Sequence, residues 1–284
     1  MSSLPAAPDL SPWKASLALT FAGRDGGTDM VRRGQVGPLA VQRPFFPEGR
    51  EVCHVYVLHP PGGIVPGDSL ELDVDVKQGA HALVTAPAAT KVYRSDGRTS
   101  KLKQTLRAAH GAFLEWLPQD TILFNGARIE LDTRIDLAGS AACIGWDILC
   151  LGRPACGERF DEGFCRQRLE VWREGVPLFI ERTRYAGAVH DAAWGLRGAC
   201  VTATLFAASP ALGSDENAVL LAELRALPVK PDELCSTTLV SGVVVMRYLG
   251  NSVENARILF EKGWRLVRPV LFGRPACHPR IWST

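Results

Sequence analysis

Three carboxylates occupy positions where this chain should be buried, which makes them the side chains best placed to do chemistry. Asp147 interrupts the apolar run 143–151, and Glu181 follows another apolar stretch. Asp68 ends the segment 59–68, whose three prolines and three glycines exclude both a helix and a central strand. A buried carboxylate is costly unless a cation or a metal ion compensates its charge. Each of the three is therefore a candidate for an ion pair or for a metal site.

When each of these three positions is considered singly, a structural role for the carboxylate has more support than a functional one. An aspartate at the exit of a tight loop commonly accepts hydrogen bonds from its own backbone, and Asp68 fits that role. For Asp147 and Glu181 the alternative is an ion pair with an arginine nearby in sequence, and the candidates are Arg153, Arg182 and Arg184.

Several catalytic and metal-binding patterns are missing from the sequence. It has no P-loop, no Gly-x-Gly-x-x-Gly, no Gly-x-Ser-x-Gly and no His-Glu-x-x-His motif. Cys143, Cys150, Cys156 and Cys165 are too far apart in sequence for a zinc site, which needs close pairs. We expect no tightly bound cofactor, and we expect the eight cysteines to be reduced thiols packed as small apolar groups.

Composition limits the partners and the compartment. The 284 residues carry a net charge of +2 with dispersed basic residues, so neither a nucleic acid nor a membrane surface is an expected partner. No secretory signal precedes Trp13, and the longest apolar run, 239–246, is too short to span a bilayer. We therefore expect a cytoplasmic protein with a flexible tail over residues 1–12 and one domain over 13–284.

Alternating apolar and polar residues predict a mainly β fold. The alternation is clearest over 69–76 and 129–137, where leucine, isoleucine and valine face acidic neighbours. A loop is expected over 23–29 and a hairpin turn over 173–176. Further strands are expected over 14–21, 38–42, 52–58, 81–86, 101–107, 113–117, 141–149, 164–172, 178–185, 201–206 and 237–247.

Three turns resemble one another and recur about every 30 residues, a spacing typical of stacked β-layers. They are Gln78-Gly-Ala, His110-Gly-Ala and Gly139-Ser-Ala. The alternative is that small residues recur at any strand turn. If the three turns are a true structural repeat, the pattern predicts β-helix-like stacked sheets.

Helical patterns occur only in the C-terminal third. Leucines at helical spacing predict a helix over 214–227, with Ser214 as its N-cap and Pro228 after its end. A second helix should begin after Asn251 or Ser252 and end near Pro269.

Five segments, taken together and in order, resemble the UreD (also called UreH) family of urease accessory proteins. Two features depart from the family pattern: Pro66 stands where a glycine is usual, and Asp120 where a glutamate is common. The matching segments are HPPGGIVPGD (59–68), TKVYRS (90–95), EWLPQ with TILF (115–119 and 121–124), LGRPA with GE (151–155 and 157–158), and GRPA with PRIW (273–276 and 279–282).

The resemblance implies a non-catalytic maturation factor with a β-rich fold and two helices at one end. Such proteins bind apo-urease and, with a UreF-type partner and a UreG-type GTPase, help insert nickel into the urease active site. The family also suggests that nickel passes through the protein, and Asp68, Asp147 and Glu181 match acidic positions of the family. The C-terminal residues Arg280, Ile281 and Trp282 are candidates for binding a partner.

Nickel chemistry makes carboxylates suitable for transient passage. Imidazole and thiolate hold Ni(II) tightly, whereas carboxylates and water release it more easily. Asp68, Asp147 and Glu181 would therefore suit transit better than storage. An alternative from a different class is a β-helical carbohydrate-active enzyme that uses paired carboxylates in an open groove.

Overall fold

The first of two β-sheets is built mostly from parallel strands. The computed structural model describes residues 12–213 and 217–283, so nearly all of the expected tail 1–12 lies outside it. The strand order of this first sheet is β15-β14-β11-β8-β5-β1-β2. Its strands are β1 (Lys14–Arg24), β2 (Gly27–Val36), β5 (Ser69–Val76), β8 (Ser100–Ala108), β11 (Arg128–Leu137), β14 (Phe164–Arg173) and β15 (Val176–Tyr185).

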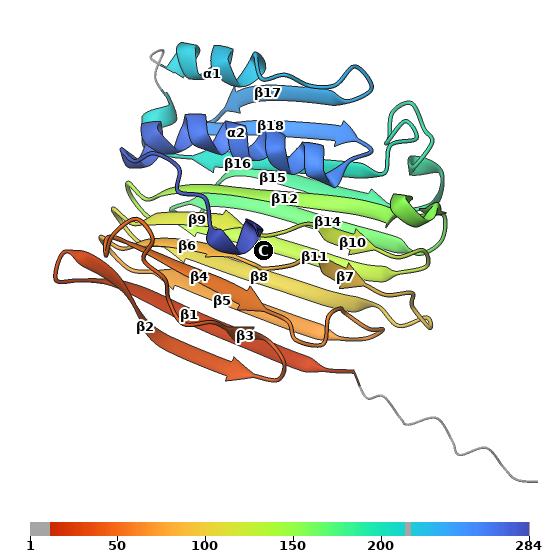
Figure 1. Ribbon diagram of the computed structural model, residues 1–284, viewed down its shortest axis with the longest axis horizontal. Helices are drawn as coiled ribbons and strands as arrows, with labels where there is room; N and C mark the ends of the chain where they lie inside the picture. The colour runs from red at the N-terminus through yellow and green to blue at the C-terminus, as the bar shows by residue number, and fades with distance from the viewer. Residues whose placement is uncertain (1–11, 214–216, 284) are drawn as a thin grey trace, which may run out of the picture.

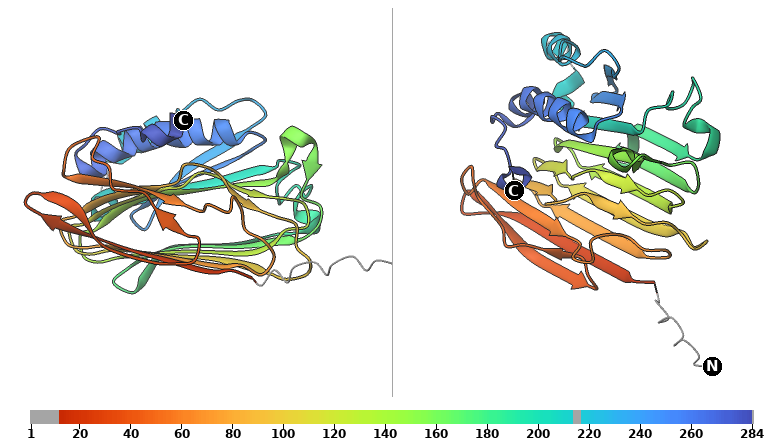
Figure 2. Two further views of the ribbon diagram at one scale, coloured as in Figure 1. Left: turned by 60° about the horizontal axis from the view of Figure 1, so that its bottom comes forward. Right: turned by 45° about the vertical axis from the view of Figure 1, so that its right-hand side comes forward.

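The second sheet packs face to face with the first (Figure 1; Figure 2, left). Its order is β17-β18-β16-β12-β9-β6-β4-β3, and three short strands, β7, β10 and β13, lie off this path. The bounds are β3 (Ala40–Val41), β4 (Val52–Leu58), β6 (His81–Thr85), β7 (Thr90–Val92), β9 (Phe113–Leu117), β10 (Thr121–Leu123), β12 (Ala142–Arg153), β13 (Glu158–Arg159), β16 (Val201–Ala208), β17 (Leu234–Val240) and β18 (Val243–Gly250).

The chain alternates between the sheets, and each alternation forms one coil of a solenoid. Three tight turns lead from β5 to β6, from β8 to β9 and from β11 to β12. Each turn ends in a fully buried alanine whose N–H donates to the carbonyl three residues earlier, at 2.9–3.0 Å. These alanines are Ala80, Ala112 and Ala141, so the recurring turns of the sequence are equivalent corners of stacked coils. The prediction of β-helix-like stacked sheets is confirmed.

Antiparallel hairpins flank the parallel coils, and two of them differ from the prediction. The predicted loop 23–29 is mostly strand, because Asp25 and Gly26, with φ of 49° and 74°, form a two-residue turn between β1 and β2. Only the first two residues of β2 are buried and half of its residues are exposed, so the strand lacks an apolar alternation. The single strand predicted over 237–247 is the hairpin β17–β18, which turns at Ser241 and Gly242.

Two α-helices cover the outer face of the second sheet. Helix α1 (Ala218–Arg225) lies inside the predicted range, although the proposed cap Ser214 falls outside the described residues. In α2 (Val253–Phe272) the hydroxyl of Ser252 caps the first turn by accepting from the Asn255 N–H at 3.1 Å. The helix continues three residues beyond the predicted end at Pro269. A proline this near the end removes only one helical hydrogen bond, and the buried Leu271 and Phe272 hold the last turn.

The second sheet has an apolar layer on each side. Alternate residues of β12 show this: Ile144, Trp146 and Ile148 pack toward α2, whereas Cys143 and Leu149 pack between the sheets. Burial on both faces explains why this strand is apolar almost throughout its length. No helix among the described residues is long and apolar enough to cross a membrane.

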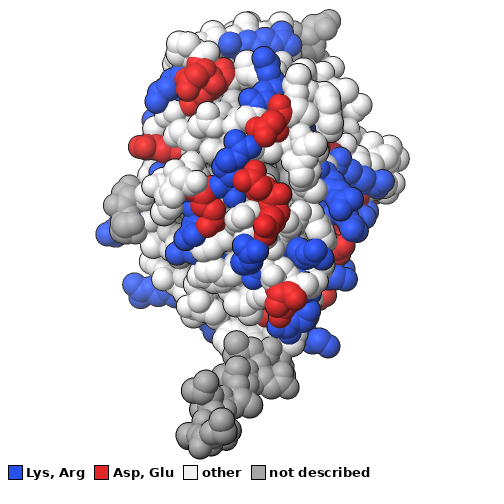
Figure 3. Space-filling model, turned by 90° about the vertical axis from the view of Figure 1, so that its right-hand side faces the viewer, with Lys and Arg blue, Asp and Glu red and all other residues white. Residues whose placement is uncertain are grey.

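The tight turns at the coil corners lie at one end of the molecule, and the longer loops between the sheets lie at the other end. Loops 59–68, 86–99 and 186–200 belong to the second end, which carries intermingled acidic and basic side chains (Figure 3).

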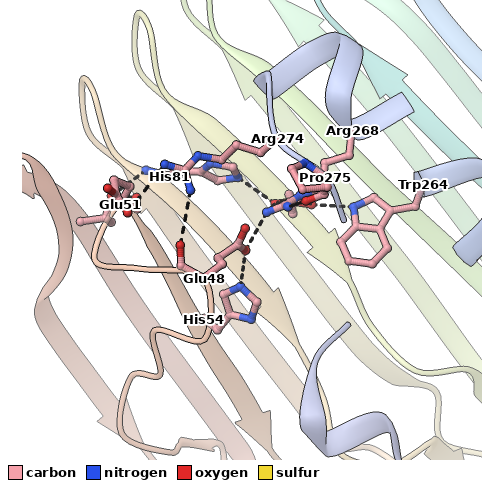
Figure 4. Close-up of polar contacts among 10 residues, drawn as sticks. Glu48, Glu51, His54, His81, Trp264, Arg268, Arg274 and Pro275 are labelled. Atoms are coloured by element: carbon pink, nitrogen blue, oxygen red, sulfur yellow. Dashed lines mark hydrogen bonds and ion pairs between the residues drawn. The ribbon is translucent and has the colours of Figure 1, made fainter. Parts of the chain in front are cut away.

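A buried ion network attaches α2 to the β-body. The side chain of Arg268 is fully buried, and its Nε donates to both carboxylate oxygens of Glu115 at 3.0 Å. Its Nη2 donates to Glu48 at 2.7 Å, and its Nη1 donates to the carbonyl of Pro275. Figure 4 shows this guanidinium between the helix and the loop before β4. The network therefore joins three segments that are distant in sequence.

Every carboxylate oxygen of Glu115 has a partner. Trp264 Nε1 donates to Oε2 at 2.6 Å, and His81 Nε2 forms a hydrogen bond with Oε1 at 2.7 Å. Burial by itself would raise the pKa of Glu115, but the contacts with His81 and Arg268 lower that pKa to about 2. Glu115 therefore stays ionised at any pH near neutrality. A second hydrogen bond, between His54 Nε2 and Glu48 at 2.7 Å, extends the network.

Removing the guanidinium would leave two carboxylates without their cation. We expect Arg268→Met to lower the free energy of unfolding by about 3–5 kcal/mol, the usual effect of breaking a buried ion pair. Denaturant unfolding of the purified chain measures this change. Arg265→Met is the matched control, because Arg265 is exposed on the same helix and should cost less than about 0.5 kcal/mol. A loss below about 1 kcal/mol for Arg268→Met would contradict the structural role of the network.

Candidate functional site

A cavity of about 510 Å³ lies between the two sheets. Apolar side chains of β4, β5 and β8 form much of its wall, including Val57, Leu72 and Leu102. Residues 59–60, 62–64 and 86–91 line the end where the longer loops lie. The signature stretch 59–68 is therefore one boundary of an internal space as well as a connection between strands.

Polar side chains face this internal space from both sheets. Gln104 on β8 and Thr133 on β11 are paired in register, and the Thr133 hydroxyl donates to Gln104 Oε1 at 2.7 Å. On the next strand of the first sheet, Gln167 Nε2 donates to Asp147 Oδ2 on the second sheet at 2.9 Å. Asp147 lines the cavity, so one carboxylate of the three predicted candidates faces it.

The surroundings of Asp147 raise the pKa of its carboxyl group. Burial raises the pKa of this carboxyl, the hydrogen bond from Gln167 lowers it, and the nearby charge of Glu181 raises it, giving a value of about 6. Asp147 is thus ionised at neutral pH but gains a proton in mildly acidic solution. The carboxylate of Glu181 is thus close enough to Asp147 for its charge to act on that carboxyl.

Glu181 is paired with an arginine that the sequence did not suggest. Its Oε2 accepts from Arg247 Nη2 at 2.9 Å, with the glutamate side chain 20% and the arginine side chain 49% exposed. The predicted partners Arg153, Arg182 and Arg184 are wrong, because the first pairs with Glu158, the second with Glu170, and the third lies over the ring of Phe164. Alternation along β15 explains this, since Arg182 and Arg184 point to the outer face and Glu181 points between the sheets.

Asp68 lies apart from the other two carboxylates. Its Oδ1 accepts from the Trp13 N–H at 2.8 Å, and its Oδ2 accepts from the Val65 N–H at 3.0 Å. Both hydrogen bonds hold backbone N–H groups in place. Asp68 therefore has the structural role that the sequence analysis gave as its alternative. His59, in the same loop, lines the cavity, and burial lowers its pKa despite the opposing charge of Asp68.

Among the described residues, the interior offers no cluster of thiols or imidazoles that would hold a metal ion strongly. Burial raises the pKa of Cys143 to about 12, and burial together with the charge of Asp147 raises the pKa of Cys165 well above its ordinary value. Both thiols stay protonated at neutral pH and are poor metal ligands in that form. Within residues 12–213 and 217–283, no three His, Cys, Asp or Glu side chains come together as a metal site would require.

The C-terminal residues that we named as partner contacts are partly engaged within the chain. Trp282 Nε1 donates to Thr85 Oγ1 at 2.8 Å, and its ring packs against those of Trp146 and Trp264. Arg280 is exposed, whereas Ile281 is half-buried. Partner binding by Arg280, Ile281 and Trp282 stays a prediction.

Sequence reasoning missed the polar residues that connect the carboxylates. Gln104, Gln167 and Arg247 stand at inward positions of strands whose other inward residues are mostly apolar. That break in the alternation is the signal that could have found them. The partner of each residue, however, lies on another strand and depends on the register between sheets.

The fold and the site define a class of protein: a β-solenoid with covering helices and a partly polar internal cavity. A family model described as UreD urease accessory protein matches residues 14–283. The chain belongs to this family of urease accessory proteins, as its signature segments suggested.

Three relatives illustrate the extent of the similarity, and each is called urease accessory protein UreD. The protein from Saccharophagus degradans is 43% identical and covers 100% of this chain and 98% of its own length. The protein from Alkalilimnicola ehrlichii is 46% identical, with coverage of 99% and 95%. The protein from Pseudomonas entomophila is 44% identical, with coverage of 96% and 95%. These names describe accessory proteins and support a role in urease maturation.

Neutralising Asp147 should stabilise the protein at neutral pH. Because the folded-state pKa of about 6 lies above the ordinary value of 3.8, ionisation of Asp147 opposes folding. We expect Asp147→Asn, which keeps the acceptor for Gln167, to raise the free energy of unfolding by about 1–3 kcal/mol at pH 7. The gain should fade between pH 6 and pH 4 and vanish below pH 4, as both states become protonated.

Denaturant unfolding at several pH values tests this prediction. Asp132→Asn is the control, because Asp132 forms an exposed ion pair with Arg168 and should change stability by less than about 0.5 kcal/mol. A destabilised Asp147→Asn protein would show that the carboxylate serves folding.

Proposed function

We propose that this protein binds apo-urease and, together with UreF-type and UreG-type partners, assists the insertion of nickel into the urease active site. The proposal rests on membership of the UreD family and on one structural observation, the Asp147 carboxylate that faces an internal cavity. The protein would act without catalysing a reaction. Nickel would be its cargo and would not stay bound as a resident cofactor.

The polar side chains between the sheets suit a passage for this cargo. Asp147 lines the cavity, and its neighbour Glu181 reaches partial exposure beside Arg247. A divalent cation could move from one carboxylate to the next while amide and hydroxyl oxygens of the wall replace part of its water shell. Because no cluster of three ligands forms among the described residues, the cation would be held loosely enough to leave.

The remaining predicted acid has a different role in this proposal. Asp68 fastens the loop that borders the cavity by binding two backbone N–H groups. It would therefore keep the boundary of the passage in place without contacting nickel. The alternative of a carbohydrate-active enzyme finds little support, since Asp147 faces an internal space and Glu181 is neutralised by Arg247.

Co-expression with a urease operon at limiting nickel tests the proposal. A strain lacking this chain should yield urease that is low in both activity and nickel. Asp147→Asn and Glu181→Gln should each lower urease activity about tenfold, the effect of losing one charge-assisted contact of about 1.4 kcal/mol. Urease activity and the nickel content of the purified urease are the two measurements.

Matched controls separate the passage from general effects on the protein. Asp73→Asn and Glu71→Gln remove acids from the outer face of β5 in the first sheet and should leave activation unchanged. The interior variants should still co-purify with apo-urease. Full nickel occupancy without this chain would refute the maturation role, whereas normal activation by the interior variants would refute only the passage.

A further inference from the structure

The outer face of the β14–β15 hairpin carries like charges directly opposite each other. Arg166 on β14 is paired in register with Arg184 on β15, and Arg168 with Arg182. All four side chains are exposed. Like charges opposite each other destabilise an antiparallel pair, so two consecutive arginine pairs work against folding of this hairpin.

A fifth arginine joins this group around one aromatic ring. Arg128 on β11, Arg166 and Arg184 each hold the guanidinium carbon 5.6–5.9 Å from the centre of the Phe164 ring. Phe164 begins β14, at the end of the molecule seen in Figure 3, where basic side chains gather toward one side. Three positively charged side chains thus lie around the Phe164 ring on the outer face of the first sheet.

Nearby carboxylates do not balance this charge. Glu130 pairs with Arg166 at 2.8 Å, Asp132 with Arg168 at 2.8 Å, and Glu170 with Arg182 at 3.1 Å. No ion pair of Arg128 or Arg184 occurs within the described residues. Five arginines thus face three acids.

Protection of a sheet edge accounts for only part of this arrangement. Strand β15 lies at the edge of the first sheet, and charged side chains on edge strands hinder association between sheets. That purpose explains Arg182 and Arg184. It does not require arginine at the opposing positions of β14, or Arg128 two strands away, where a neutral or acidic residue would give a more stable sheet.

The geometry points to a docking surface for an acidic segment of a partner protein, formed by Arg128, Arg166, Arg168, Arg182 and Arg184. Guanidinium groups bind carboxylates in planar, two-pronged pairs, and the two arginine rows are two residues apart, or about 7 Å. An extended segment with acids at alternate positions matches this spacing. The partner's carboxylates would supply the negative charge that the hairpin itself lacks.

A labelled peptide of four Glu-Ser repeats is a direct probe, and fluorescence anisotropy with the full chain measures its binding. We expect Arg166→Gln/Arg184→Gln to bind the peptide about tenfold more weakly than the unaltered protein. The matched control Arg32→Gln/Arg33→Gln removes two exposed arginines from β2, at the opposite edge of the same sheet, and should keep at least half of the affinity. The assay needs neither nickel nor urease, so its failure leaves the proposed maturation role intact.

Three results would overturn the docking surface. The first is an equal loss of affinity in the two double variants. The second is tighter binding of a twenty-nucleotide oligo-thymidine than of the peptide, which would indicate a general polyanion surface. The third is a lower thermal midpoint for Arg166→Gln/Arg184→Gln than for the control, which would assign the arginines to folding. Relief of like-charge repulsion should leave that midpoint unchanged or raise it.

Discussion

Moving a guanidinium and two carboxylates out of water costs several kcal/mol for each ion, and the attachment of α2 depends on recovering that cost. Arg268 recovers it because its contacts with Glu115, Glu48 and the carbonyl of Pro275 satisfy all three of its nitrogen atoms. The direction of these bonds also fixes where the helix lies on the second sheet. An apolar interface alone would allow the helix to slide or rotate, whereas a buried guanidinium has one position in which its partners are satisfied.

The cavity between the sheets differs from the Arg268 network in how the charge of its acid is compensated. Its wall is mostly apolar, yet Asp147, Gln104 and Thr133 interrupt that wall at inward positions. The raised pKa of Asp147 indicates that this carboxylate is poorly compensated, in contrast to Glu115, whose pKa is lowered. One protein therefore contains two interior acids with opposite electrostatic surroundings, Glu115 fully buried and Asp147 facing the cavity. The compensated acid holds the structure together, whereas the poorly compensated acid takes up a proton in mildly acidic solution.

Local pattern predicted the repeating part of the fold, because each coil meets its neighbour along strands whose alternation is visible in the sequence. Strands β5 and β11 and the three corners are examples. Strand β2 escaped prediction because only its first two residues are buried, and the β17–β18 hairpin because apolar residues lie on both sides of its Ser241–Gly242 turn. Asp147 and Glu181 could be found as misplaced acids. Their partners could not, since Glu181 and Arg247 are 66 residues apart and meet only after the sheets have stacked.

The coil corners also bear on the order in which the chain folds. Neighbouring coils are separated by about 30 residues, so each layer can close against the preceding one while synthesis continues. The bonds from Arg268 to Glu115 and Glu48 span 153 and 220 residues and must wait for nearly the whole chain. Until then Glu115 and its apolar surroundings remain open to water. A nascent chain of this protein thus passes through a stage in which the layers are built but one flank is uncovered, and that flank is where chaperones or premature association would act.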